Sequence, residues 1–353
     1  MMTVTMNSRL KEKLLFETTP FHEVVKEMIV EKNLYSYFIN NPDHREILLS
    51  RTRQLAEDFK KKNPQAIYSL HRSLGWIYEL HLYTPGKHPV YNQFNPILLE
   101  VQRLLEMAWE EFEDQRIPKV DYPENPDEFI RWFKLMLINH EVAEHKLFHY
   151  LEKNASFEEM AYFFSQEITV DSRFDDLVAL AQIGLDNDVK MELAENYWDE
   201  MGNGDMSKVH TIMFDHLLEE LKVTGDKSLN SLFNDASWES LACGNVLLHS
   251  VIHRKNAYRA LGALGAVEML APKRFSYLVK GYKRIGLSEK AQEYHVLHIS
   301  IDAKHGDGWL RNAIAPVIKR NPEAKKEIIK GAYYRLNTSM DYCNMLYQTF
   351  TKN

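Results

Sequence analysis

The chain has 353 residues, of which 45% are hydrophobic and 26% charged, with a formal net charge of −7. This composition excludes a disordered chain, and a negative charge without any basic cluster argues against nucleic-acid binding. The two cysteines, Cys243 and Cys343, lie far apart and outside any CxxC spacing, which excludes a disulfide framework. No apolar run reaches the ~18 residues of a membrane span, and the N-terminus lacks a signal-peptide pattern. We therefore expect a cytoplasmic protein with a small-molecule partner and with neither nucleic-acid nor membrane partners.

Helical periodicity dominates the chain, and segments that alternate like β-strands are almost absent, so we expect an all-α fold. Amphipathic stretches at 46–61, 66–83 and 95–112 predict an N-terminal helical domain at 1–115. The following segment, IPKVDYPENP, carries three prolines and no helical pattern. It predicts a linker at 116–126 and a second domain at 127–353.

The second domain opens with a predicted helix from Asp127 to about Asn154, and a capping box at Ser156 and Glu159 predicts the start of the next. A helix around 191–200 meets two glycines, which predict a break before the helical pattern resumes at 207–221. The remaining predicted helices are 238–270, which Pro272 is expected to stop, 274–285, 288–305 with Ser288 as N-cap, 309–319 and 323–350. A compact bundle of this kind can hold ligands in its middle.

The most informative local pattern is His298-Ile-Ser-Ile-Asp302-Ala-Lys-His305. Offsets of four and three residues place the three polar groups on one stripe of a helix, and their neighbours are apolar. Burying an Asp and two His without partners costs several kcal/mol, so the stripe indicates either a metal site or a dense hydrogen-bond network.

Further acids and a histidine occur in apolar or distorted segments. Glu268 ends an apolar run of small residues, GALGAVE, which permits close helix approach, although a helix end that emerges into solvent is the alternative. Glu200 and His210 flank the Gly202-Asn-Gly204 break, and Glu167 lies on a largely apolar helix.

Together these residues offer four carboxylates and three imidazoles, which is too many for one four-coordinate zinc. Mixed oxygen and imidazole donors without cysteine suit iron or manganese. Two such ions that share carboxylates could bind dioxygen between them.

Residues from about 127 to 350 resemble the haem-oxygenase-like diiron oxidases, a family also known as iron-containing redox enzymes. The resemblance rests on the segment His145-Lys-Leu-Phe148-His-Tyr150-Leu151, on Glu167, and on three ordered blocks: Glu200…Gly202-Asn-Gly204…His210, Gly-Ala-Leu-Gly-Ala-Val-Glu268 and His298…Asp302…His305. It implies the helical bundle of haem oxygenase without haem. The additional domain at 1–115 resembles helical extensions that help form a dimer in some members, so we expect a homodimer.

The resemblance implies two iron ions as cofactors, O2 as co-substrate and an external electron donor. The iron ligands that it implies are Glu167, His210, Glu268, His298, Asp302 and His305. Glu200 matches an additional carboxylate of members that oxygenate nitrogen, so we expect it to be both a ligand and a catalytic residue. We expect oxygenation of an amine- or guanidine-type nitrogen of a small metabolite, through a peroxide held between the irons. Desaturation, C–C cleavage or decarboxylation of an amino or fatty acid, as in other members, is the alternative.

Four residues near the ligand blocks are expected to shape the substrate pocket, although an arginine on a helix is more often a solvated surface group: Trp198, Tyr258, Arg259 and Arg311. A metalloprotease is excluded because the histidines of HEVAEH (140–145) are five positions apart rather than four. His249 and His253 do have the four-residue spacing but lack a nearby acid motif, so we favour packing or substrate contact over metal binding.

Three other interpretations were weighed against the diiron oxygenase. A ferritin-like bundle would need paired Glu-x-x-His motifs, and the sequence offers no convincing pair. A metal-free TenA-like hydrolase or cofactor-independent oxidase of the same fold would not need seven ligand-type residues. A binding or scaffold protein would tolerate alanine at the polar stripe without loss of any activity.

Overall fold

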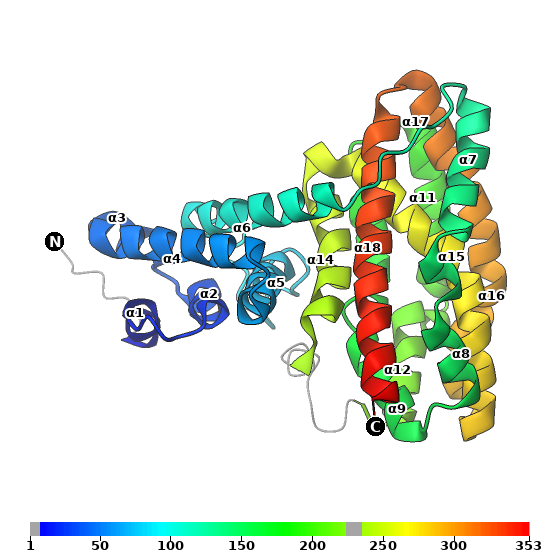
Figure 1. Ribbon diagram of the computed structural model, residues 1–353, viewed down its shortest axis with the longest axis horizontal. Helices are drawn as coiled ribbons and strands as arrows, with labels where there is room; N and C mark the ends of the chain where they lie inside the picture. The colour runs from blue at the N-terminus through cyan, green and yellow to red at the C-terminus, as the bar shows by residue number, and fades with distance from the viewer. Residues whose placement is uncertain (1–7, 224–234, 353) are drawn as a thin grey trace. The chain divides into compact units, whose positions relative to one another are not determined.

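The computed structural model describes residues 8–223 and 235–352, and it divides the chain into two compact units, Met1–Arg116 and Ile117–Asn353. Each unit is described by itself. Within the described ranges the protein is helical and contains no strand, only an isolated bridge between Pro85 and His88 (Figure 1). The all-α prediction is confirmed. No helix in these ranges combines the length and the apolar character needed to cross a membrane.

Over residues 8–116 the first unit has six helices: α1 (Ser8–Leu15), α2 (Phe21–Val30), α3 (Leu34–Asn40), α4 (Pro42–Lys60), α5 (Pro64–Glu79) and α6 (Pro96–Gln115). Two of them begin with an Asn-Pro pair in which the asparagine side chain caps the helix. Asn63 Oδ1 accepts from the backbone N–H groups of Gln65 and Ala66, and Asn95 Oδ1 accepts from that of Ile97. Proline suits the first helical turn because its missing N–H would have no partner there.

The second unit contains the helices that carry the candidate ligands, together with short 3₁₀ turns. Its longer elements are α7 (Pro126–Ile138), α8 (Lys146–Lys153), α9 (Phe157–Glu167), α10 (Phe174–Ala181), α11 (Asn187–Glu200), α12 (His210–Glu220), α14 (Trp238–Ile252), α15 (Ala257–Ile285), α16 (Glu289–Gly308), α17 (Ala315–Arg320) and α18 (Ala324–Thr351). A π-helix, η6 (Trp309–Ile314), joins α16 to α17. The capping box at Ser156 and Glu159 and the N-cap at Ser288 are both present, as predicted.

Helix α15 packs against both α16 and α18, and these three helices run lengthwise through the unit (Figure 1). Glycine makes the contact with α18 possible, because a Cβ at Gly262 would lie 1.9 Å from the carbonyl oxygen of Ile328. A Cβ at Gly331 would likewise lie 2.0 Å from the carbonyl oxygen of Arg259. The small residues predicted to permit close helix approach therefore do so, and they hold Glu268 on a buried helix.

Two predicted helix boundaries are wrong because side chains cap the backbone inside the expected helices. The helix expected over 127–154 is split into α7, a 3₁₀ turn (Glu141–Glu144) and α8, since Nδ1 of His140 and of His145 accept from the backbone N–H groups of Val142 and Leu147. The helix expected over 238–270 is interrupted after Ile252. There the side chain of Asn256 donates to the carbonyl oxygen of His249.

Pro272 was expected to stop a helix, but α15 continues through it to Ile285. Proline removes the hydrogen bond that residue 272 would give to the carbonyl oxygen of Glu268. The packing of α15 on both sides maintains the helix in spite of that loss.

Candidate metal centre

The first candidate ligand group is Glu200, His210 and His298. The turn between α11 and α12 brings Glu200 to His210, and α16, which packs against α12, supplies His298. Gly202 and Gly204 both have positive φ angles, 62° and 87°, and Asn203 between them has φ 53°. A Cβ at Gly202 would lie 2.5 Å from the carbonyl carbon of Lys208, so only glycine fits there. The predicted break thus reverses the chain and brings the last residue of α11 next to the first residue of α12.

The three side chains of this first group are all buried, with 2–4% exposure. Nδ1 of His210 lies 2.9 Å from Oε2 of Glu200, and Nε2 of His298 lies 3.8 Å from Oε1 of Glu200. Nδ1 of His298 is 2.6 Å from the carbonyl oxygen of Tyr294. Because a carbonyl only accepts, Nδ1 carries the proton and Nε2 is left to face Glu200.

The electrostatics of the first group are those of a buried ion pair. Burial alone would raise the pKa of Glu200, but the adjacent His210 and His298 imidazoles lower it to about 2. Burial would lower the pKa of His298, but the charges of Asp302 and Glu200 raise it to about 9. Without a metal, this group is stabilised as a carboxylate next to an imidazolium.

The second candidate group, Glu268, Asp302 and His305, lies between α15 and α16. All three residues are buried, with 3–5% exposure. Nδ1 of His305 is 3.8 Å from Oε2 of Glu268. Nε2 of the same ring is 2.8 Å from Oδ2 of Asp199. An imidazole that donates one N–H to a carboxylate is oriented for metal binding through its other nitrogen.

The two carboxylates of the second group repel each other in a buried setting. Burial, the charge of Asp302 and the charge of Glu200 raise the pKa of Glu268 well above its usual value. Burial raises the pKa of Asp302 to about 7, with Glu200 adding to the effect and His298 opposing it. A cation between these carboxylates would remove the cost of ionising them.

The two groups adjoin each other, since Glu200 and His298 of the first act electrostatically on Asp302 of the second. Within each group the candidate ligand atoms lie within 4.8 Å of one another. Donors bound to one ion at about 2.0–2.2 Å are about 3–4 Å apart, so each group is close to the spacing of a single site. The donor set of three carboxylates and three imidazoles fits two iron ions.

Glu167 does not belong to either of these groups. It is buried, and its carboxylate forms an ion pair with Arg274 of α15. A metal role for Glu167 stays a prediction, and within the described ranges its observed partner is a guanidinium.

The four residues expected to shape a substrate pocket lie outside the cavity of the second unit. Trp198 is 53% exposed, and Arg311 is an exposed side chain paired with Asp307. Arg259 is buried and paired with Glu327, and Tyr258 is half-buried. Their substrate role stays a prediction, since none of the four lines the cavity described below.

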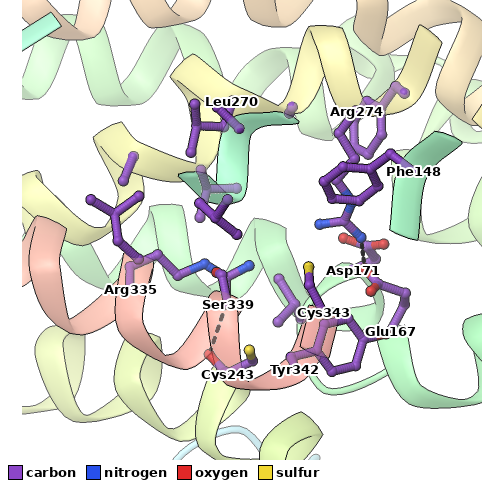
Figure 2. Close-up of a pocket in the computed structure, with 18 of the residues that line it drawn as sticks. Phe148, Glu167, Asp171, Cys243, Leu270, Arg274, Arg335, Ser339, Tyr342 and Cys343 are labelled. Atoms are coloured by element: carbon purple, nitrogen blue, oxygen red, sulfur yellow. Dashed lines mark hydrogen bonds and ion pairs between the residues drawn. The ribbon is translucent and has the colours of Figure 1, made fainter. Parts of the chain in front are cut away.

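That cavity lies inside the second unit, has a volume of about 60 Å³, and is lined mainly by α9, α15, α18 and the 3₁₀ turn Asp171–Arg173 (Figure 2). Phe275 lines it, and the Phe275 ring centroid is 5.8 Å from that of His298. The cavity therefore ends one side chain away from the first ligand group. Its charged lining residues are Glu167, Asp171, Arg274 and Arg335.

Several residues of the centre were missed from the sequence. Asp199, the residue before Glu200, orients His305 but was not among the predicted site residues. Asp171 lines the cavity, and His295 is fully buried one turn before His298, with Nδ1 3.1 Å from the Tyr282 hydroxyl. The HxxHxxxDxxH spacing of α16 could have drawn attention to His295, but an isolated aspartate such as Asp171 gives no comparable signal.

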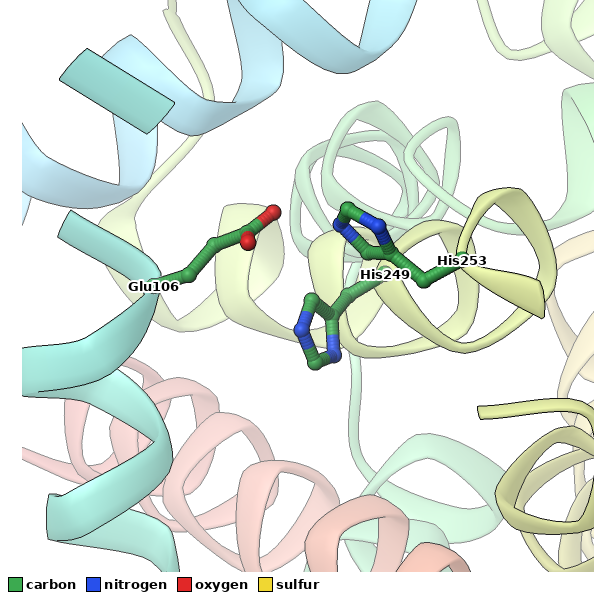
Figure 3. Close-up of side chains that lie close together, drawn as sticks. All are labelled: Glu106, His249 and His253. Carbon is green, nitrogen blue, oxygen red and sulfur yellow. The ribbon is translucent and has the colours of Figure 1, made fainter. Parts of the chain in front are cut away.

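Four further histidines lie outside the two ligand groups, and for His249 and His253 the preference for packing or substrate contact over metal binding stays a prediction. His140 and His145 cap helix starts, which agrees with excluding a metalloprotease. His249 is buried, and its ring centroid is 5.1 Å from that of His253 at the C-terminal end of α14 (Figure 3). The edge-to-face geometry is that of a packing contact.

Comparison with known proteins gives one family match and a fold likeness. Residues 161–340, just over half of the chain, match a family described as iron-containing redox enzyme. No curated protein matches. A crystal structure at 2.00 Å of a CADD-like protein of unknown function from Nostoc punctiforme is similar, with 21% identity over 62% of this chain and 95% of that chain and a TM-score of 0.50. A 1.35 Å structure of that protein gives 23% identity over 62% and 93%, with a TM-score of 0.48.

Proposed function

The chain belongs to the iron-containing redox enzyme family, and from that premise we propose that it is an O2-dependent non-haem diiron oxygenase that acts on an amine- or guanidine-type nitrogen. The observation that carries this proposal is the pair of adjoining buried groups, Glu200–His210–His298 and Glu268–Asp302–His305. One ion in each group would neutralise carboxylates whose burial is otherwise costly.

A bound pair of ferrous ions supplies electrons and open coordination positions for O2. In the overall reaction one oxygen atom is added to the substrate nitrogen and the other is released as water. That balance consumes two protons and two electrons, so an external two-electron donor must act in each turnover.

The chain's own residues hold the ligands in the orientation that metal binding needs. The Tyr294 carbonyl fixes the His298 ring, and Asp199 fixes the His305 ring, so that Nε2 of His298 and Nδ1 of His305 face the carboxylates. The Tyr294 and Phe275 rings pack against His298 with centroid distances of 4.2 and 5.8 Å. This aromatic wall excludes water and strengthens electrostatic interactions inside the centre.

Glu200 supports nitrogen as the site of oxygenation. It adds a third carboxylate to the donor set and lies next to both His210 and His298, which crowds the first ligand group. A nitrogen lone pair can accept oxygen without first needing a C–H bond to be broken, so the crowded arrangement favours it.

The test is product analysis with anaerobically loaded iron, O2, a reductant and a panel of amines and guanidines. For the wild type we expect a product heavier than its substrate by one oxygen, labelled when ¹⁸O2 is used. Glu200→Ala is expected to lower that product at least about 10-fold. Glu195→Ala, on the exposed face of the same helix, is the matched control and should be unaffected.

Three outcomes of this test separate the possible reactions. Loss of N-oxygenation on Glu200→Ala supports the proposal. Full activity of that variant with unchanged products removes the role assigned to Glu200. Formation of desaturated, cleaved or decarboxylated products by the wild type contradicts N-oxygenation and leaves the diiron assignment intact.

A further inference from the structure

The buried cavity next to the centre has a charge at each end (Figure 2). Arg335, on α18, reaches in from one side, whereas Glu167, Asp171 and Arg274 are grouped at the other side. Each of the four side chains lines the cavity. Burying charged side chains costs free energy unless a partner compensates them. Charges at both ends of the cavity therefore indicate a ligand that carries the opposite charges.

Arg335 is the positive end of the cavity. Arg335 is only 7% exposed, and its Nη1 donates to the carbonyl oxygen of Cys243 at 3.3 Å. Within residues 8–223 and 235–352 it forms no ion pair with a carboxylate. A guanidinium has five N–H donors in a planar fork, so most of the donors of Arg335 are left to bind a ligand carboxylate in the cavity.

Asp171 is the negative end of the cavity. Arg274 is already paired with Glu167, so Asp171 is the remaining acid on its side. Burial and the charge of Glu167 raise the pKa of Asp171 to about 7, and a cationic ligand nitrogen would favour its ionised form. Asp171 is only 7% exposed, and its Oδ2 atom is buried without a hydrogen-bond donor among the described residues. An unpaired buried carboxylate oxygen is costly, and a ligand N–H would satisfy it.

The acidic end is the one near the metal centre. The charge of His298 acts on Asp171, and Phe275 both lines the cavity and packs against the His298 ring. A ligand nitrogen held by Asp171 would therefore be closer to the first ligand group than a carboxylate held by Arg335.

We propose that this cavity binds a small zwitterionic amino acid, with its carboxylate on Arg335 and its protonated nitrogen on Asp171. A volume of about 60 Å³ corresponds to about four to six waters at ~10–15 Å³ each, which is the size of a short amino acid. That this ligand is the substrate rests on the proposed function, and it requires the bound nitrogen to release its proton before oxygenation, with Asp171 as the adjacent acceptor. Binding of the ligand does not rest on that function.

Binding is tested by calorimetry on the full-length protein without metal, using glycine, β-alanine, 4-aminobutyrate and 5-aminopentanoate. These compounds keep both charges and vary the distance between them. One member is expected to bind best, because only one length spans the two ends. For that member, the amine that lacks the carboxylate and the acid that lacks the nitrogen are each expected to bind about 10- to 100-fold more weakly.

Variants then assign each end of the ligand to its residue. Arg335→Gln should weaken binding of the zwitterion about 10-fold or more and leave the affinity for the carboxylate-free amine unchanged. Asp171→Asn should also weaken binding of the zwitterion and should leave the affinity for the nitrogen-free acid unchanged. Arg131→Gln, an exposed arginine on α7, is the control that should change neither.

The inference is overturned if the wild type binds none of the four compounds, or if the single-charge analogues bind as tightly as the zwitterion. These comparisons use the wild type, so poor folding of a variant does not remove the test. Zwitterion binding without any iron-dependent reaction would uphold the cavity assignment and contradict the proposed function. An iron-dependent reaction without zwitterion binding would support the proposed function and contradict the cavity assignment.

Discussion

The two candidate ligand groups differ in their charge, although they adjoin each other and share α16. Glu200, His210 and His298 combine one carboxylate with two imidazoles, and the pKa changes are those of an ion pair, lower for the acid and higher for His298. Glu268, Asp302 and His305 combine two carboxylates with one imidazole, and the pKa of both acids is raised. The first group can therefore be stable without a cation, whereas the second needs either protons or a metal.

This difference implies unequal contributions to iron binding. Two buried carboxylates gain more from a cation than one carboxylate that already has an imidazolium partner. We therefore expect the second group to depend more strongly on metal for its stability.

The largest expected effect is the loss of one iron ion. Asp302→Ala removes a carboxylate of the second group, and we expect bound iron to fall from two ions per chain to one, measured by metal analysis after anaerobic loading. Glu293→Ala, which removes a half-buried acid of the same helix that pairs with Lys208, should keep both ions. Two ions bound to Asp302→Ala would mean that Asp302 is not a ligand.

A smaller effect is expected on the stability of the metal-free protein as the pH changes. Folding raises the pKa of Asp302 from 3.8 to about 7, so the folded state holds this proton more tightly than the unfolded chain does. Stability from this group is therefore present at low pH and is lost as the pH rises from about 4 through 7. We expect the free energy of unfolding to fall by about 1–3 kcal/mol between pH 5.5 and 7.5.

Denaturant unfolding at the two pH values measures this change, and Asp302→Asn is the informative variant. It should reduce the pH dependence because the titrating group is gone. An unchanged dependence in Asp302→Asn would assign the effect to other groups and would remove the contrast between the two ligand groups.

The smallest effect is expected from Asp199, which contacts His305 rather than an iron ion. Asp199→Asn keeps the size of the side chain but loses the charge that fixes the His305 ring, and we expect iron affinity to fall about 10-fold. Fe(II) titration measures the affinity. Because the change acts on the second group alone, equal weakening of both sites would contradict a positioning role.

Much of the fold could be predicted from the sequence because local signals agree with the packing. Ser156, Ser288 and the pair Gly202 and Gly204 each mark a helix boundary through a capping or positive-φ requirement that the structure satisfies. Pro272 was misleading because its effect on a helix depends on what packs around it, and the sequence does not display that packing.

The ligand groups were within reach of sequence reasoning because α16 carries three of their residues on one stripe. Their division into two groups was not, since it depends on where α11, α12 and α15 meet that stripe. Asp199 and Asp171 were missed for the same reason, because only the folded chain brings Asp199 to His305 and Asp171 to the wall of the cavity. Glu167 stays a predicted ligand, because a buried acid on an apolar helix can be stabilised by a metal ion or by a guanidinium, and in the structure its carboxylate pairs with Arg274.

Anaerobic Fe(II) titration of the wild type and of His298→Ala and Asp302→Ala, followed by O2 exposure, tests the diiron centre most directly. We predict two irons per chain in the wild type, one in each variant, and rapid O2 consumption only by the wild type. No iron binding, or stoichiometry that neither variant changes, would contradict a diiron centre at these residues.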